Sequence, residues 1–186
     1  MKIVRDSSVD EAVLEWLKAE LDSERFGCDL RAALARAQCD ETIIRAADLH
    51  DAQANQKRWR ILTDYRDWLD RDLNDYDWQW VELDQNEVGS LDYINYSYWN
   101  ELSDNTRKVK RAATNIANGK VVFDVPNDRF WAVAQAVEAG GALPPIIVVS
   151  GPGDTPGEIL EGHVRATGYV LARQTAQPLA AVWGRR

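Results

Sequence analysis

The stretch Pro145–Leu171, PIIVVSGPGDTPGEILEGHVRATGYVL, decides the fold because two short apolar runs and a helical pattern follow one another within it. Pro145–Ser150 is continuously apolar up to its last residue, which is typical of a strand buried on both faces. The Gly- and Pro-rich residues 151–157 predict a loop. Glu158–Glu161 predicts a short strand, and His163–Arg173 predicts a helix with an apolar inner face.

The flanking segments extend this pattern in both directions. Leu179–Trp183 predicts a last strand, and Lys120–Val125 predicts an earlier strand that Pro126 ends. Asn127 then predicts the N-cap of a helix that stops at Gly140 and Gly141. We therefore predict a small mixed α/β unit over residues 120–186.

Residues 1–119 have a helical period instead. Apolar stripes predict a first helix that starts after Ser7 or Ser8 and ends at Gly27, and a second helix around residues 30–37. The stripe along Glu41–Leu73 predicts one long helix or two, with a soft break near His50–Asn55. A further helix is predicted over Asn105–Asn118. Asp84 followed by Glu87 resembles a capping box, and it predicts a helix with Leu91, Ile94 and Tyr98 on one face. The expected fold class is α+β, with a mainly helical, Trp-rich acidic region at 1–119 before the mixed-sheet unit at 120–186.

Charge argues against broad nucleic-acid binding. The net charge is −8, and residues 111–186 carry a net +1, so residues 1–110 carry a net −9. Such a surface repels phosphates. Trp78, Trp80 and Trp99 lie among acids rather than among Arg and Lys, so we expect them in the core or in a protein interface and not as a base-stacking platform.

The composition indicates a folded protein without a membrane-spanning segment. Hydrophobic residues make up 45% of the chain and charged residues 28%, which is enough for a core and excludes wholesale disorder. No apolar run approaches the roughly 20 residues that span a bilayer. The N-terminus, Met1–Asp6, has no apolar segment after it, so we expect no signal peptide and a cytoplasmic protein.

Cys28, Cys39 and His50 are too widely spaced on a helix to share one metal ion, and we expect ordinary thiols.

The densest group of chemical side chains is Glu161–Gly168, at the predicted strand-to-helix junction. Free N–H groups and the helix dipole favour an anion at such a junction, and Gly162 allows close approach of the backbone. His163 and Arg165 add donors at the rim, while Glu161 could bind a metal ion or orient an attacking hydroxyl. A nucleotide phosphate is the natural ligand. The alternative is a surface turn in which Arg165 forms a salt bridge and nothing binds.

These elements together resemble the ParB/sulfiredoxin-like superfamily over about residues 121–182. The likeness rests on Gly141 before the Pro145–Val149 strand, on the run Ile159-Leu-Glu-Gly162-His-Val-Arg165-Ala-Thr-Gly168, and on the closing strand Leu179–Val182. In that family a strand leads into a Gly-x-x-Arg turn that opens a helix. Members include partition proteins that bind and hydrolyse CTP, sulfiredoxins, small kinases acting on free serine, and reported nucleases.

The resemblance implies a nucleotide-phosphate site at this turn, with ATP or CTP and Mg²⁺ as cofactors. Gly162, His163, Arg165 and Thr167 would bind the nucleotide, Glu161 and His163 would be catalytic, and Glu161 would hold the metal. Val164 departs from the His or Arg that usually precedes the family's Arg. The turn has no Cys, so sulfiredoxin chemistry is not expected.

Three functional hypotheses follow. The first is a nucleotide-dependent phosphotransferase or phosphohydrolase. The second is a non-catalytic protein-binding or inhibitor module of a plasmid, phage or toxin-type system, which would hold a protein partner through the Trp-rich helical half. The third, a nuclease, is disfavoured by the charge.

Overall fold

The computed structural model describes residues 1–66, 68–69, 71–153, 155–175 and 177–186. The chain is α+β and forms two compact units. We call residues 7–78 the helical unit and residues 1–6 with 79–186 the sheet unit. The sequence-based division lay at residues 119 and 120, whereas the sheet unit also takes in the first six residues and residues 79–119.

The helical unit is built from the apolar stripes that the sequence predicted. Its elements are α1 (Val9–Leu21), α2 (Gly27–Arg36), α3 (Thr42–Arg45), α4 (Ala52–Tyr65) and the 3₁₀ turn η1 (Leu73–Asp75). Ser8 caps α1 by accepting the Glu11 N–H at 3.2 Å, as predicted. The pattern over residues 41–73 resolves into α3 and α4, and the Asp51 side chain caps α4. Gly27 begins α2 rather than ending the helix before it.

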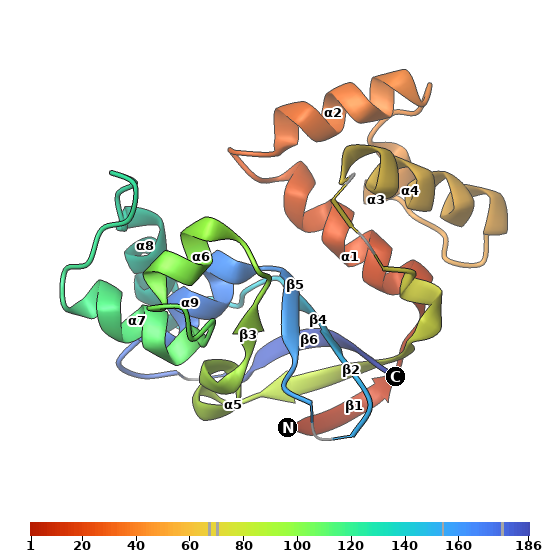
Figure 1. Cartoon of the computed structure of the whole chain (residues 1–186). Helices are drawn as coiled ribbons and strands as arrows, with labels where there is room; N and C mark the ends of the chain where they lie inside the picture. The colour runs from red at the N-terminus through yellow and green to blue at the C-terminus, as the bar shows by residue number, and fades with distance from the viewer. Residues whose placement is uncertain (67, 70, 154, 176) are drawn as a thin grey trace. The chain divides into compact units, whose positions relative to one another are not determined.

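The sheet unit contains, within the described residues, a six-stranded mixed sheet in the order β1-β2-β6-β4-β5-β3 (Figure 1). The strands are β1 (Lys2–Asp6), β2 (Asp77–Leu83), β3 (Asp92–Tyr93), β4 (Ile146–Ser150), β5 (Glu158–Glu161) and β6 (Leu179–Arg185). The central strand β4 is buried at every residue. It pairs in parallel with β6 and antiparallel with β5. Short β3 is parallel to β5, with Tyr93 beside Ile159.

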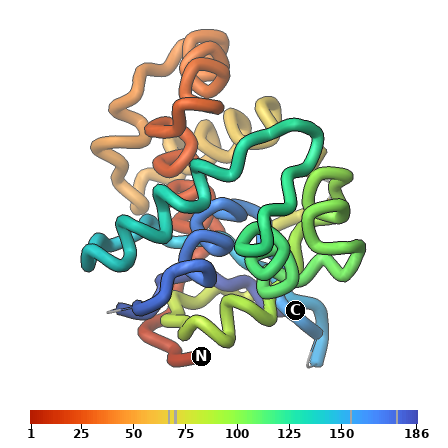
Figure 2. Tube along the Cα trace, turned by 90° about the vertical axis from the view of Figure 1, so that its left-hand side faces the viewer, coloured from red at the N-terminus to blue at the C-terminus, as the bar shows by residue number. Residues whose placement is uncertain are grey.

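The helices of the sheet unit gather on one side of this sheet (Figure 1). They are α5 (Gln85–Ser90), α6 (Ser97–Leu102), α7 (Val109–Ala117), α8 (Asp128–Glu138) and α9 (His163–Leu171). The core between helices and sheet includes Tyr93, Phe130 and Ile146, each 0% exposed. Gly168 lets α9 approach α8, because a Cβ there would lie 2.5 Å from the Val133 Cβ. Figure 2 shows α8, in teal, crossing the face turned to the viewer.

The prediction of a strand at Lys120–Val125 is wrong. Val122 and Val125 form only an isolated bridge, because Phe123 and Asp124 adopt left-handed φ values of 51° and 56° and reverse the chain. The Val125 N–H donates to the Val122 carbonyl at 3.0 Å, which closes a tight turn.

Other boundaries also differ from the prediction. The capping box of Asp84 and Glu87 is present, but α5 ends at Ser90 and the backbone at Leu91 is extended, so Tyr98 belongs to a separate helix. The helix predicted from Asn105 begins at Val109, since Asn105 and Arg107 have positive φ. Strands β1, β2 and β3 lie inside the region predicted to be helical.

Candidate functional site

The predicted site lies where two parallel strands end at one edge of the sheet. Because β3 and β5 run in the same direction, the chain leaves both at this edge, at Ile94 and at Gly162. The antiparallel strand β4 begins there, so the Pro145 carbonyl lies at the same edge. Ligands of open α/β sheets bind in such a place, outside the carboxyl ends of strands.

Gly162 makes the turn between β5 and α9 with φ +97°, in the left-handed region that favours glycine. A Cβ at this residue would lie 2.5 Å from the Ile146 Cγ2 and 3.0 Å from the Arg165 Nη2. The glycine therefore allows close packing on β4 and lets the Arg165 guanidinium lie against the backbone at the start of α9.

Arg165 is the cation of this junction. Its Nη2 donates to the Pro145 carbonyl at 3.1 Å and to the Glu161 Oε1 at 3.3 Å. Both side chains of the Arg165–Glu161 ion pair are 16% exposed. The Arg165 Nε is buried and has no hydrogen-bond partner in the protein. An unpaired buried donor costs about 1–3 kcal/mol, so the guanidinium has an unused capacity for an acceptor.

The electrostatic setting of Arg165 is unfavourable without an anion. The first helical bond of α9 runs from the Ala166 N–H to the Gly162 carbonyl, so the N–H groups of residues 163–165 precede the hydrogen-bonded ladder. A helix N-terminus carries partial positive charge, and a guanidinium there opposes the dipole. The Glu161 carboxylate offsets this charge in the structure, so the predicted salt bridge of Arg165 is present.

His163 is placed inside the unit and not at the rim where we expected it. Its ring is 5.0 Å from Trp99 and nearly parallel to it, at 12°, and 5.9 Å from Tyr93. His163 is only 9% exposed. The prediction of a rim donor is wrong because α6 and β3, which are distant in sequence, bring aromatic rings against the imidazole.

Thr167 is wholly buried behind this stack. Its hydroxyl donates to the His163 carbonyl at 2.6 Å and is 2.7 Å from the Tyr93 hydroxyl. Burial raises the pKa of the Tyr93 phenol well above its ordinary value, so this pair stays neutral. Thr167 therefore positions the first turn of α9, and its buried hydroxyl already bonds to protein groups. Its contact with a nucleotide stays a prediction.

The acids next to the junction are largely paired. Arg107, which sequence reasoning missed, donates to both the Tyr93 carbonyl and Glu158, and Lys108 pairs with Asp92 at 2.7 Å. Among the described residues no cluster of three His, Cys, Asp or Glu side chains could hold a metal ion by itself. Glu161 alone fits Mg²⁺ only together with phosphate oxygens, which is how this ion is commonly bound.

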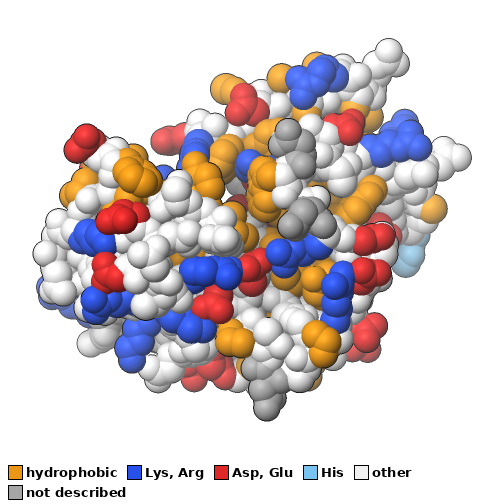
Figure 3. Space-filling model, viewed as in Figure 1, with side chains coloured by type: hydrophobic (Ala, Val, Ile, Leu, Met, Phe, Trp, Pro, Cys, Tyr) orange, Lys and Arg blue, Asp and Glu red, His pale blue; other side chains and the backbone are white. Residues whose placement is uncertain are grey.

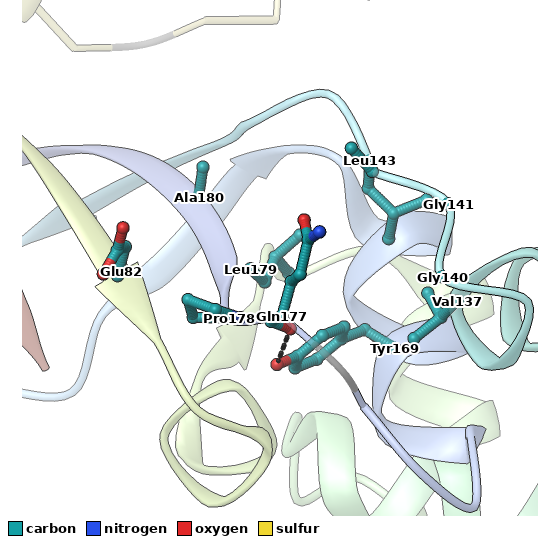
Figure 4. A pocket seen from close by; sticks show the side chains of 11 residues that line it. Glu82, Val137, Gly140, Gly141, Leu143, Tyr169, Gln177, Pro178, Leu179 and Ala180 are labelled. Atoms are coloured by element: carbon teal, nitrogen blue, oxygen red, sulfur yellow. Dashed lines mark hydrogen bonds between the residues drawn. The ribbon is translucent and has the colours of Figure 1, made fainter.

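A cavity of about 420 Å³ lies elsewhere in the sheet unit, between the end of α8 and the start of β6. Val137, Leu143, Tyr169 and Leu179 line it, and the Tyr169 hydroxyl donates to the Gln177 carbonyl at 2.9 Å (Figure 4). Neither Glu161 nor Arg165 lines this cavity, so it is separate from the candidate site.

Of the three tryptophans expected in the core or in a protein interface, Trp80 is only partly buried. Trp78 and Trp99 are 5% and 8% exposed and lie in the core. On the face drawn in Figure 3, Lys and Arg lie among Asp and Glu and form no single-sign patch. No helix in the described part of the chain is both long and apolar enough to cross a bilayer.

Comparison with protein-family models, with curated proteins and with solved structures finds no match for this chain. The ParB/sulfiredoxin-like resemblance therefore rests on the residues alone.

Proposed function

We propose that the β5–α9 junction binds a phosphate group of a nucleotide and that the protein is a nucleotide-dependent phosphotransferase or phosphohydrolase. The observation that carries the proposal is Arg165, held at the start of a helix by Pro145 and Glu161 while its Nε has no partner. A phosphate oxygen would satisfy this donor and the first N–H groups of α9 together. The negative charge of phosphate would also offset the repulsion between the Arg165 guanidinium and the partial positive charge at the N-terminus of α9.

Binding changes the position of Glu161 in this proposal. Phosphate competes with the Glu161 carboxylate for the same guanidinium, so the bound state releases the carboxylate beside the phosphate. Glu161 would then accept the proton of the attacking hydroxyl, which belongs to water in hydrolysis and to an alcohol in transfer. The hydroxyl oxygen would bond to the terminal phosphorus while the bond from that phosphorus to the bridging oxygen breaks and the nucleoside diphosphate leaves. Mg²⁺ bound by Glu161 and the nucleotide would neutralise phosphate charge. His163 and Thr167 hold the first turn of α9 in place.

The test is a titration of labelled ATP and CTP, with Mg²⁺, into the wild type and Arg165→Ala. We expect the substitution to weaken binding about 10- to 150-fold, which corresponds to about 1.5–3 kcal/mol for hydrogen bonds to a charged group. Arg173→Ala is the matched control, because this exposed arginine follows the other end of α9. It should leave the affinity unchanged. Equal affinities for wild type and Arg165→Ala, or no binding by the wild type at millimolar nucleotide, would reject the site.

A second variant separates binding from turnover. Glu161→Gln removes the carboxylate that competes for Arg165, so nucleotide affinity should be kept or increased while turnover falls. Single-turnover measurement of phosphate release at saturating nucleotide reports the chemical step directly. Undiminished turnover in Glu161→Gln would remove Glu161 from the chemistry without affecting the binding site.

A further inference from the structure

Apolar and polar groups together line the cavity of about 420 Å³ between the end of α8 and the start of β6. Val137, Leu143 and Leu179 contribute hydrocarbon surface to it, and Val137 and Leu179 belong to the core. Pockets for small organic ligands have about 300–1,000 Å³ and mainly apolar walls with a few polar groups. The cavity has the volume and the mixed lining of such a pocket, so a ligand that fills it has an apolar body.

Glu82, the last but one residue of β2, carries the one charge among the described residues that line the cavity. Its Oε2 accepts from the Lys2 Nζ at 2.8 Å, and no other described group bonds to the carboxylate. The Lys2 side chain is 74% exposed, and an ion pair so open to water contributes little stability. A ligand cation can therefore bind the carboxylate through Oε1 or displace Lys2 from it.

Gln177 and Tyr169 add neutral polar groups to the lining. Figure 4 shows the Gln177 side chain extending toward Leu143, and within the described residues its amide forms no hydrogen bond. The Tyr169 hydroxyl donates to the Gln177 carbonyl at 2.9 Å, so its oxygen can only accept a further hydrogen bond. Together with the Glu82 carboxylate, these groups offer mainly acceptors, which suit a ligand that carries N–H groups.

The charge of the lining disfavours acidic ligands. No Lys, Arg or His occurs among the described residues that line the cavity, so a ligand carboxylate or phosphate would meet Glu82 without a compensating cation. An uncompensated charge in a partly buried site is costly. The net charge of −8 also raises the local concentration of cations at the surface of the protein. Both effects favour a positively charged ligand.

We propose that this cavity binds a small organic cation, namely a protonated amine with an aliphatic or aromatic body and no acidic group. The ammonium group donates to the Glu82 carboxylate, and the body packs against Val137, Leu143 and Leu179. A charge-assisted hydrogen bond of this kind fixes the orientation of the ligand, while apolar contact buries its surface. Because neither Glu161 nor Arg165 lines the cavity, this site is independent of the proposed nucleotide site.

Matched pairs of an amine and an alcohol test the requirement for charge. 2-Phenylethylamine and tryptamine are titrated into the ¹⁵N-labelled full chain, each beside its neutral counterpart, 2-phenylethanol or tryptophol. We expect saturable shifts of the Gly140, Gly141 and Ala180 amide resonances, with dissociation constants in the millimolar range for amines of so few atoms. Each alcohol should bind at least about fivefold more weakly, because it lacks the charge that pairs with Glu82.

Two variants of one ion pair separate the role of the carboxylate from that of the surrounding structure. Glu82→Gln should weaken amine binding at least about fivefold and leave alcohol binding unchanged. Lys2→Met breaks the same ion pair but keeps the carboxylate, so the affinity for the amines should be kept or increased. Ala180→Phe places a larger side chain in the cavity and should weaken the binding of amines and alcohols alike. Thermal melting verifies that each variant is folded.

The absence of saturable binding by both amines at tens of millimolar would overturn the proposal, as would equal affinities for an amine and its alcohol. Equal losses in Glu82→Gln and Lys2→Met would also overturn it, because the effect would then come from the broken ion pair and not from the carboxylate. Amine binding that persists undiminished in folded Ala180→Phe would place the ligand outside the cavity and would have the same consequence.

Discussion

At the scale of single residues, Gly162 sets the geometry of the β5–α9 junction. Gly162→Ala should be destabilising for two reasons: its left-handed φ disfavours a Cβ, and that Cβ would collide with Ile146. The backbone cost is about 1–2 kcal/mol, and overpacking adds about 1–3 kcal/mol. Urea unfolding of the variant and the wild type measures the sum.

Gly119→Ala is the matched control for this prediction. Gly119 has φ +84° but no atom within 4 Å of the position of an added Cβ, so only the backbone cost applies. An equal loss of stability in the two variants would contradict the close packing between Gly162 and β4.

The candidate site was partly predictable at this scale. Glu161, Gly162 and Arg165 are neighbours in the chain, so local spacing was enough to place them at one turn. The burial of His163 and Thr167 was not predictable, because their partners Trp99 and Tyr93 come from elements about 65 to 75 residues away in sequence. The contribution of the Pro145 carbonyl to the site has no sequence signal at all, since every residue has a carbonyl.

At the scale of elements, Asp104 connects the loop before α7 to Asn115 within that helix and to Lys120 beyond its end. Its Oδ1 accepts from the Lys120 Nζ at 2.8 Å, and its Oδ2 accepts from the Asn115 Nδ2 at 2.9 Å. These hydrogen bonds, that of Lys120 above all, hold the pKa of Asp104 well below its ordinary value. A carboxyl whose pKa is lowered by folding stabilises the protein above its unfolded pKa, and this stabilisation is lost as pH falls.

Asp104→Asn should therefore lower the free energy of unfolding at neutral pH, and its difference from the wild type should shrink below about pH 4, where the unfolded carboxyl becomes protonated. Urea unfolding of both proteins at pH 7 and at about pH 3 gives the comparison. A difference that is the same at both pH values would show that the charge of Asp104 is not what stabilises the loop.

Elements with a clear period were predicted well, and elements defined by backbone conformation were not. Helices α1, α2 and α8 and strands β4, β5 and β6 match the apolar patterns of their segments. Lys120–Val125 has the composition of a strand, yet the positive φ of Phe123 and Asp124 makes a turn that composition does not reveal. Strand β1 was missed because its five residues are all exposed and show no alternation of buried positions.

At the scale of the whole molecule, strand pairing joins segments that the sequence separates widely. Lys2 pairs with Glu82, so β1 and β2 are neighbours in the sheet although most of the helical unit separates them in the sequence. Such long-range pairing is specified by the complementary faces of the two strands and not by local propensity. Because local patterns do not reveal it, the sequence suggested a single division between the two regions, near residue 120. The candidate site belongs to the sheet unit.

The central claim is that the Arg165 guanidinium binds phosphate, and the most direct measurement follows its Nε–H by ¹H–¹⁵N NMR. The resonance is assigned by its loss in Arg165→Lys, and ATP with Mg²⁺ is then titrated into the labelled wild type. The account predicts a saturable downfield shift of the Arg165 Nε–H, because a buried donor without a partner gains a charged acceptor. An Arg165 resonance that stays in place at millimolar ATP, while the protein remains folded, would contradict the account.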